Sequence, residues 1–390
     1  SAINGTVTRN LVNYDNTIKG YFNTAVFESE HKWVQYEKNP TLTRTMYNKA
    51  KTLGIKNVRG HTLIWDRDYM SKPWKDNTSI PQDIAQNYNN KTYLDTRIEN
   101  HINAISTDYK GQLCDWDVVN ELTNNHCMTE LYNKETLAQW FNWAKQYDPD
   151  ATRYINETGI TGTGDDHLNR FCAYLDYMVQ NNVDFEGIGV QSHFSAACNI
   201  EDFKAQLDRL ASYGKRLKIT EFDFNKNGNL QSDFTRDIIL LSFSLPQVDG
   251  FLGWGFWDSS HWLHNAMLFD KNWNLKNSGK QYVNLVFNNW WSDESGITDE
   301  NGNFSKRVFY GDYEVTAKYM GHTVKKTVSF NRGDENEVDI VFDTDSFEFT
   351  PAKLTGRNYN FDNVSSFVSN TDFVAGGAYP NISQNIKISG

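Results

Sequence analysis

The sequence has no excess of positive charge and no long apolar run, and each shortage excludes a class of protein. The formal net charge is −11, so the basic face that nucleic acids or anionic membranes require is not expected. No apolar stretch reaches the length of about 18 residues that a membrane-spanning helix needs. No signal peptide precedes Ser1. A mature secreted chain also lacks one, so a cytoplasmic location does not follow.

Cysteine is also scarce. The four cysteines are Cys114, Cys127, Cys172 and Cys198, and no two of them have C-x-x-C spacing. This argues against a zinc site or a redox motif. Buried thiols and one or two disulfides are equally compatible with the spacing. We expect no bound metal.

Aromatic residues, in contrast, are abundant. The chain of 390 residues has 12 Trp, 20 Tyr and 24 Phe, or 14% of its length. Clefts that stack on planar or ring-shaped ligands use such residues. The length fits either one large domain or a large domain and a small one.

Short apolar runs that end in polar residues alternate with segments of helical apolar spacing. Seven such runs predict strands at 21–29, 58–66, 116–121, 152–157, 187–193, 217–223 and 251–258. The spacing predicts helices over 94–107, 134–147, 166–181 and 200–213. The alternation indicates an α/β fold with a parallel sheet. Polar residues at the carboxyl ends of many strands are typical of a (β/α)8 TIM barrel. A doubly wound sheet is the alternative, but no glycine-rich phosphate turn follows the first strand.

Two carboxylates stand out among the strand ends. Glu121 and Glu221 close the fourth and seventh barrel strands if one strand precedes those recognised. In a barrel such ends converge, and two carboxyl groups can divide glycoside hydrolysis into an acid and a nucleophile. Retention of configuration needs a separation of roughly 5–5.5 Å. His193 and Asp223 are placed to keep Glu221 ionised. For any one of these residues alone, a hydrogen-bonded polar group at a strand end explains it equally well.

Five motifs then resemble one family. VRGHTLIW, WDVVNE, GIGVQSH, ITEFD and GWGFWD resemble, in order and spacing, the motifs of glycoside hydrolase family 10, the endo-β-1,4-xylanases, over about residues 20–290. By this resemblance Glu121 is the acid/base and Glu221 the nucleophile. Asn120 would bind the sugar 2-hydroxyl, and His193 and Asp223 would support the nucleophile.

Further residues are expected to contact the substrate, because they match family positions or end a predicted strand. They are Glu28, Lys32, His61, Trp65, Asn156, Gln191, Trp254 and Trp262. Tryptophan faces stack on pyranose rings, and Lys, His and Gln bind hydroxyl groups. Core packing is the better interpretation for Trp140, Trp143 and Trp273.

The resemblance is closer to the plant- and animal-like branch, in FNTAVFESEHKW and in the β-rich segment up to about residue 343. Three residues depart from the common bacterial and fungal pattern: Ser29, Asp66 and Asp68. An acidic residue after the tryptophan is also seen in the plant-like branch. These changes put the glycone preference in doubt, and solvated loop charges explain Asp66 and Asp68 equally well.

The expected organisation has three parts. Residues 1–289 form the barrel, strands two to eight, and 290–343 form a small antiparallel β-module. Nothing before Tyr21 has the pattern of a buried strand, whereas residues 372–381 (DFVAGGAYPN) resemble the family's first strand. We therefore expect the extension 344–390 to supply the first strand at about 372–379, as in a circular permutation. A strand exchanged between protomers, or an unrelated tail, are the alternatives.

The resemblance implies retaining endo-hydrolysis of β-1,4-xylan with no cofactor, because the two carboxylates carry both roles. The expected partners are xylan or xylo-oligosaccharides, with no nucleic acid or membrane, and the protein is expected to be a secreted monomer. There are two alternatives: a retaining hydrolase that acts on another β-linked glycan, and a non-catalytic xylan-binding protein. The small module shows no obvious row of exposed aromatic residues, which favours bracing over carbohydrate binding.

Overall fold

The structure is a computed structural model that describes residues 1–66, 79–319, 321–343, 374–376 and 383–388. The chain forms two compact units, Ser1–Tyr282 and Val283–Gly390. Each is described by itself below.

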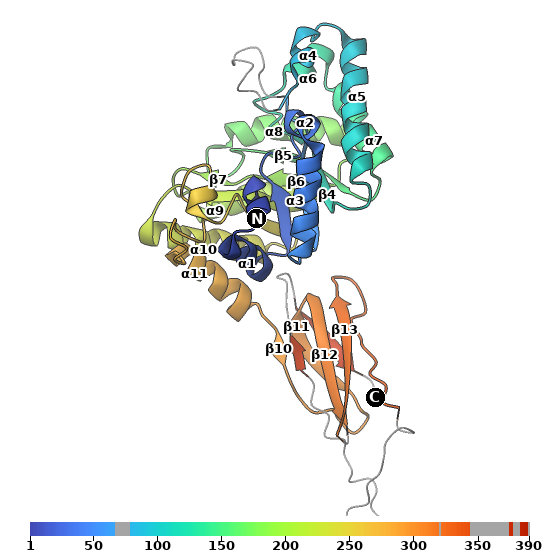
Figure 1. Cartoon of the computed structure of the whole chain (residues 1–390), viewed down its shortest axis with the longest axis vertical. Helices are drawn as coiled ribbons and strands as arrows, with labels where there is room; N and C mark the ends of the chain where they lie inside the picture. Colours follow the sequence, from blue (N-terminus) through green and yellow to red (C-terminus); the bar gives the residue numbers. More distant parts are fainter. Residues whose placement is uncertain (67–78, 320, 344–373, 377–382, 389–390) are drawn as a thin grey trace, which may run out of the picture. The chain divides into compact units, whose positions relative to one another are not determined.

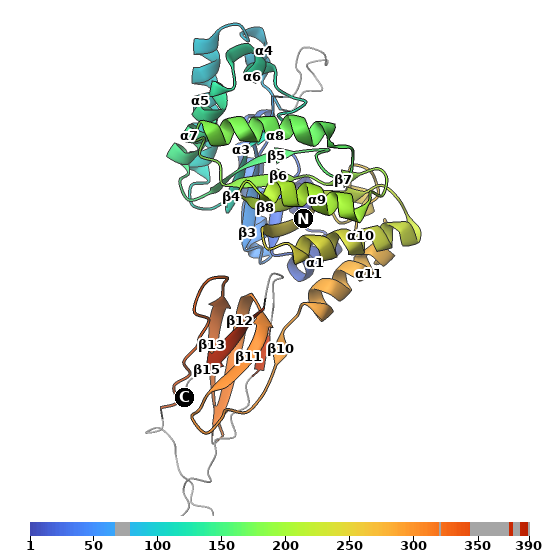
Figure 2. The ribbon, with the colours of Figure 1, turned by 180° about the vertical axis from the view of Figure 1, so that it is seen from behind.

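The first unit is a parallel (β/α)8 barrel, as the alternation of strands and helices predicted. Its eight strands are β1 (Ala2–Ile3), β2 (Thr24–Phe27), β3 (Asn57–Ile64), β4 (Asp115–Asn120), β5 (Thr152–Glu157), β6 (Gly187–Val190), β8 (Arg216–Phe224) and β9 (Val248–Gly253). The short β7 (His193–Phe194) extends the line of β6 and pairs with the end of β8. The strands lie inside a layer of helices (Figure 1 and Figure 2).

The helices that follow the strands cover the barrel. They are α1 (Val12–Tyr21), α2 (Trp33–Lys38), α3 (Pro40–Thr52), α4 (Gln82–Gln86), α5 (Lys91–Asp108), α6 (Cys127–Tyr132), α7 (Glu135–Tyr147), α8 (Asp165–Gln180), α9 (Ile200–Ala211), α10 (Gly228–Ser244) and α11 (Asn277–Val283). Local chemistry sets their starts: the Asn39 side chain accepts from Leu42 N, with proline at the first helical position of α3. Asn90 caps α5 in the same way.

The first barrel strand lies at the N-terminus, so the expectation of a displaced strand is wrong. Ala2 pairs with Val26 and Ile3 with Phe27, in parallel. The other edge of β1 meets β9, where the Ser1 hydroxyl donates to the Gly253 carbonyl at 3.1 Å. Neither a circular permutation nor a strand exchanged between protomers is needed. A two-residue strand is too short to produce the alternation by which strands are recognised.

The second unit is an antiparallel β-module, as predicted, and it contains residues 374–376, which were expected in the barrel. One sheet has the order β10 (Asp293–Glu294), β14 (Val374–Gly376), β12 (Gly311–Tyr319), β13 (His322–Phe330), and a second pairs β11 (Phe304–Phe309) with β15 (Ser383–Ile388). Val374–Gly376 pairs antiparallel with β10 and β12. Residues 344–373 and 377–382 lie outside the described residues.

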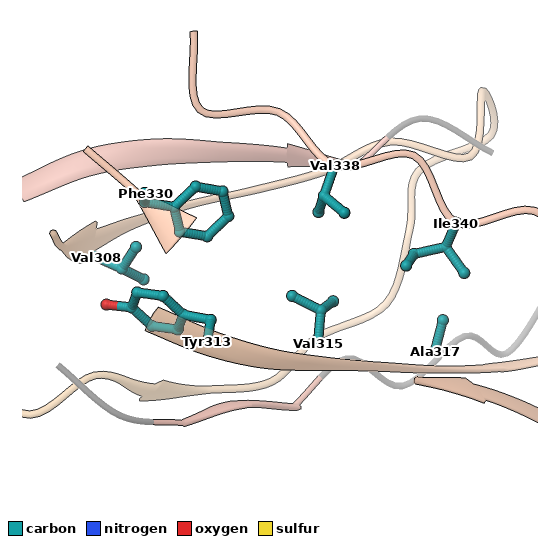
Figure 3. Packing of buried hydrophobic residues seen from close by; sticks show 7 residues of the cluster. All are labelled: Val308, Tyr313, Val315, Ala317, Phe330, Val338 and Ile340. Atoms are coloured by element: carbon teal, nitrogen blue, oxygen red, sulfur yellow. The ribbon is translucent and has the colours of Figure 1, made fainter. Parts of the chain in front are cut away.

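A small apolar core holds the module together. The side chains of Tyr313, Val315 and Ala317 on β12 face Phe330, Val338 and Ile340 across it (Figure 3). The period-two alternation of β12 produces this face, because every second side chain points to the same side of a strand.

Candidate active site

Glu121 and Glu221 lie at the same end of the barrel, on strands that are not adjacent. Glu221 is on β8 near its carboxyl end, and Glu121 directly follows β4. Glu221 is buried, and Glu121 is half-buried. The structure therefore brings together the two carboxylates that the sequence singled out.

A chain of side-chain amides joins the two carboxylates. Asn156 Nδ2 donates to Glu221 Oε1 at 2.7 Å and to Asn120 Oδ1 at 2.9 Å. Gln191 Nε2 donates to Asn120 Oδ1 at 3.2 Å and to Glu121 Oε1 at 3.1 Å. With its carbonyl oxygen already accepting twice, Asn120 has its NH2 group as the end that can donate to a ligand.

The neighbouring strand makes room for Asn156. A Cβ atom at Gly189 on β6 would lie 2.2 Å from Asn156 Oδ1. The Thr220 hydroxyl donates to the same oxygen at 2.7 Å. This bond directs the Asn156 NH2 group toward Asn120 and Glu221.

Glu221 lies among histidines that favour its ionised form. His193 Nε2 lies 3.2 Å from Glu221 Oε2, and His61 Nδ1 lies 3.9 Å from Oε1. Burial alone would raise the pKa of Glu221. The electrostatic effect of His61, together with the hydrogen bond and charge of His193, lowers that pKa to about 2. Glu221 is therefore a carboxylate throughout the physiological pH range.

His193 is held by two acids. Its Nδ1 lies 2.9 Å from Asp223 Oδ2, and the indole N–H of Trp262 donates to the same oxygen at 2.7 Å. Burial acts to lower the pKa of His193, but the hydrogen bonds to Asp223 and Glu221 raise it to about 10. The ring is thus an imidazolium that donates to Glu221 and forms an ion pair with Asp223.

Glu121 has the opposite environment. Burial raises its pKa, and the nearby charges of Glu221 and Glu157 add to that effect, against the hydrogen bond from Gln191. The indole N–H of Trp65 and the Asn125 NH2 group donate to its Oε2 at 3.2 and 3.1 Å. The site thus contains one carboxyl group biased toward protonation and one held ionised.

The backbone at Glu121 is in the left-handed region, with φ of 55°. Non-glycine residues rarely adopt this conformation, and it costs on the order of 1–3 kcal/mol. Glu121 N donates to the Asn156 carbonyl at 2.8 Å, and Asn125 N donates to the Glu121 carbonyl at 2.9 Å. These bonds hold the turn at which the strand ends.

Aromatic rings form the walls beside the carboxylates. Trp254 packs edge-on against His61 and His193, with ring centroids 5.3 and 6.2 Å apart. Trp262 is 53% exposed, so its face is open to a ligand. The Lys32 ammonium group lies 4.8 Å from the centre of the Trp65 ring.

Glu28 follows β2, and its contacts reveal residues that the sequence did not single out. Asn4 Nδ2 donates to Glu28 Oε2 at 2.8 Å and to the Ser260 hydroxyl at 3.0 Å. Asn4 was missed because β1 was not recognised. It nevertheless directly follows the small apolar pair Ala2–Ile3, which is the signal that could have found it.

The departures from the family pattern have different structural settings. Asp66 is fully buried and accepts a hydrogen bond from Met128 N, in the first turn of α6. It is therefore not a solvated loop charge. Ser29 is half-buried, and Asp68 lies outside the described residues.

Other expectations concern cysteines, tryptophans and metals. Cys114, Cys172 and Cys198 are free thiols. Trp140 is fully buried in the core, whereas Trp143 and Trp273 are half-buried, and Trp273 stacks on Trp257 at 4.4 Å. Within the described part of the chain, no three His, Cys, Asp or Glu side chains are grouped to hold a metal. No helix among those residues is long and apolar enough to cross a membrane.

Comparison with known proteins agrees with this geometry. Residues 1–285 match the family described as Glycosyl hydrolase family 10. The chain is 30% identical over 332 residues to anti-sigma-I factor RsgI6 of Acetivibrio thermocellus, with 82% of this chain and 41% of that protein covered. It is 27% identical over 323 residues to endo-1,4-beta-xylanase 3 of Arabidopsis thaliana, with 80% and 41% covered. The chain thus spans about two fifths of the length of these relatives.

Solved structures share the barrel. Native xylanase 10B from Thermotoga maritima superposes with a TM-score of 0.64 at 23% identity, over 73% of this chain and 94% of that one. Xylanase 10B from Thermotoga petrophila, in complex with xylobiose, gives 0.63 at 23% identity, over 72% and 90%. At this identity the likeness establishes the fold.

Proposed function

Because the chain belongs to glycosyl hydrolase family 10, we propose that it cleaves β-1,4-xylosidic linkages within xylan with retention of configuration. Glu121 is the acid/base and Glu221 the nucleophile. Similarity to plant enzymes named endo-1,4-beta-xylanases supports the substrate class. The xylobiose complex of the Thermotoga petrophila enzyme supports it further.

One observation carries the assignment of roles: the two carboxyl groups have opposite environments. The pKa of Glu221 is about 2, whereas burial raises the pKa of Glu121. A nucleophile must be ionised and an acid must hold its proton at the working pH, so environments that separate the two pKa values assign the roles.

The proposed reaction has two displacements. Glu221 attacks the anomeric carbon while Glu121 gives its proton to the departing glycosidic oxygen, and a covalent glycosyl-enzyme forms as the old bond breaks. Glu121, now ionised, takes a proton from water. That water attacks the anomeric carbon and releases Glu221. The Asn120 NH2 group binds the 2-hydroxyl, and Trp254 and Trp262 contact the sugar rings. The two carboxylates need no cofactor for these steps.

The test compares four enzymes on β-1,4-xylan: wild type, Glu121→Gln, Glu221→Gln and the control Glu201→Gln. Glu201 is exposed in the first turn of α9. Reducing-sugar release and product length measure endo-cleavage, and proton NMR of the first product reports its anomeric configuration. We expect the β-anomer first, a loss of about 10²- to 10⁴-fold in Glu121→Gln, and a larger loss in Glu221→Gln.

The other outcomes are equally informative. A folded wild type that releases no sugar from xylan but cleaves another β-linked glycan would show that this glycan, and not xylan, is the substrate. A wild type that binds xylo-oligosaccharides without cleaving any would make it a binding protein, an interpretation that the presence of both glutamates disfavours. Action outside the cell as a monomer, with no nucleic-acid or membrane partner, belongs to the same proposal.

A further inference from the structure

A further carboxyl group, that of the buried Glu157, lies beside the acid/base and has no part in the reaction described above. It ends β5, the strand next to the one that Glu121 follows, and it is fully buried. An ionised carboxylate in such a place is costly unless its oxygens are satisfied. The donors that satisfy it therefore indicate what it does.

Those donors come mainly from the turn after Glu121. Thr123 N donates to Glu157 Oε2 at 2.9 Å, and the Thr123 hydroxyl donates to the same oxygen. Thr158 N donates to Oε1 at 3.0 Å. All three groups donate to Glu157, so both of its oxygens act as hydrogen-bond acceptors.

Thr123 is two residues beyond Glu121, whose backbone is in the left-handed region with φ of 55°. Such a conformation persists only where its surroundings hold it. The backbone bonds between Glu121 and Asn156 hold one side of the turn. The bonds from Thr123 to Glu157 hold the other side.

We propose that Glu157 is a positioning residue for the acid/base: its buried carboxylate fixes Thr123, and through it the turn from which the Glu121 side chain projects. The inference rests on the proposed role of Glu121. Glu157 also places a negative charge near Glu121 and so disfavours ionisation of the acid.

Few other charged or titratable groups face Glu157. From α8, His167 Nε2 lies 3.7 Å from Glu157 Oε1, and the Tyr174 phenol feels its charge. From the turn after β4, the facing group is Glu121. The His167 ring is thus the nearest basic side chain, and it lies by Oε1, whereas Thr123 is held by Oε2.

The test exploits the one step that needs a proton from Glu121. Phenyl β-xylobioside has a poor leaving group that requires protonation, whereas 2,4-dinitrophenyl β-xylobioside has one that leaves without it. We expect Glu157→Gln to lower kcat/KM on the phenyl substrate about 10- to 100-fold and to change the dinitrophenyl rate much less. The neutral amide also removes a negative neighbour, so the basic limb of the phenyl profile moves to lower pH.

A second variant guards against a folding defect. Thr123→Val keeps the charge of Glu157 and removes one donor. We expect a selective loss on the phenyl substrate without a downward shift of the basic limb. The matched control is Glu201→Gln, which leaves both substrates at the wild-type rate.

The outcomes separate two failures. Equal losses on both substrates, or unchanged rates and an unmoved basic limb in both variants, would overturn the role of Glu157. A Glu121→Gln enzyme as active as wild type on the phenyl substrate would overturn the proposed function, and this inference with it.

Discussion

Two groups of charged side chains lie in the same barrel, and they differ in how fully opposite charges compensate each other. The paired cluster consists of Arg59, Asp115, Asp117 and Lys218, toward the amino ends of the strands. The rim cluster consists of Glu121, Glu157, Glu221 and Asp223, at the carboxyl ends. Seven of these eight residues are buried, and Glu121 is half-buried.

The paired cluster balances two cations against two anions. Arg59 Nε lies 2.6 Å from Asp115 Oδ1, and its Nη2 lies 2.6 Å from Asp117 Oδ1. Lys218 Nζ lies 2.5 Å from Asp115 Oδ2. Although burial would raise the pKa of Asp115, Arg59 and Lys218 hold it below its usual range. Every charge there has a partner in contact.

The rim cluster has four acids, and the basic side chains in direct contact with them are histidines. His193 lies between Glu221 and Asp223. His61 Nδ1 lies 2.9 Å from Asp117 Oδ2 and 3.9 Å from Glu221 Oε1. The comparison shows that a fully paired set of buried charges serves the stability of the fold. An under-compensated set leaves one acid with a raised pKa, and a raised pKa is what proton transfer needs.

Breaking the paired cluster should have the largest effect on stability. Arg59→Met leaves Asp115 and Asp117 without the guanidinium group that bridges them. We expect a loss of about 3–5 kcal/mol in the free energy of unfolding, because an uncompensated buried charge costs that much. Urea unfolding of the barrel, followed by tryptophan fluorescence, measures it.

The control for this prediction is Arg209→Met. Arg209 is exposed on α9, and its substitution should change the unfolding free energy by less than about 0.5 kcal/mol. An Arg59→Met protein as stable as this control would mean that Lys218 alone compensates both aspartates.

At the rim, removing a cation should change chemistry more than stability. In His193→Gln, Glu221 loses a charge-assisted hydrogen bond, which is worth about 1.5–3 kcal/mol and so about 10- to 100-fold in kcat/KM. A positive neighbour lowers a carboxyl pKa, so its removal raises the pKa of Glu221 above about 2. The acid limb of the pH profile on xylan should therefore move to higher pH. An unmoved acid limb would show that His61 alone keeps Glu221 ionised.

The strand ends explain why both glutamates could be found from the sequence. A buried apolar run that closes in Asn120–Glu121, and another that contains Glu221 and Asp223, place polar groups where parallel strands converge. That is a local pattern combined with a rule of the fold. Eight strands with short connections leave few other arrangements.

The sequence could not show which side chains contact each other across strands. The bond from Thr123 to Glu157, or the bridge from Asn156 to Glu221, depends on the register of neighbouring strands, and no local pattern encodes register. The first strand was missed because Ala2–Ile3 is too short to have a period. The small apolar residues at 374–376 suit an inner strand of an antiparallel module as well as they suit a barrel. The sequence around Asp66 is typical of a loop. Its contact with Met128 N in the first turn of α6 depends on the tertiary fold.

Neutralising the acid should stabilise the protein, in contrast to the effect in the paired cluster. The pKa of Glu121 is raised from 4.5 by burial and by its acidic neighbours. The folded wild type therefore loses stability as pH rises from about the unfolded value through the folded one. Glu121→Gln has no such loss, and we expect a gain of about 0.5–2 kcal/mol at neutral pH.

This gain should disappear below the unfolded pKa of about 4.5, where Glu121 is protonated in both states. Unfolding midpoints at neutral and acidic pH measure it, with Glu201→Gln as the exposed control. A variant no more stable than wild type at neutral pH would show that Gln191, Trp65 and Asn125 fully satisfy the ionised acid.

The smallest effect should come from a hydroxyl that touches neither carboxylate. The Thr220 hydroxyl donates to Asn156 Oδ1 at 2.7 Å, and this bond keeps the Asn156 NH2 group turned toward Asn120 and Glu221. Thr220→Val has nearly the same shape and leaves that oxygen without its donor, at a cost of about 1 kcal/mol in stability. It also frees the amide to turn, so kcat should fall by a few-fold while KM for xylo-oligosaccharides stays constant. If KM rose and kcat did not change, Asn156 would act on the bound sugar rather than on the nucleophile, and the amide chain between the two carboxylates would serve binding alone.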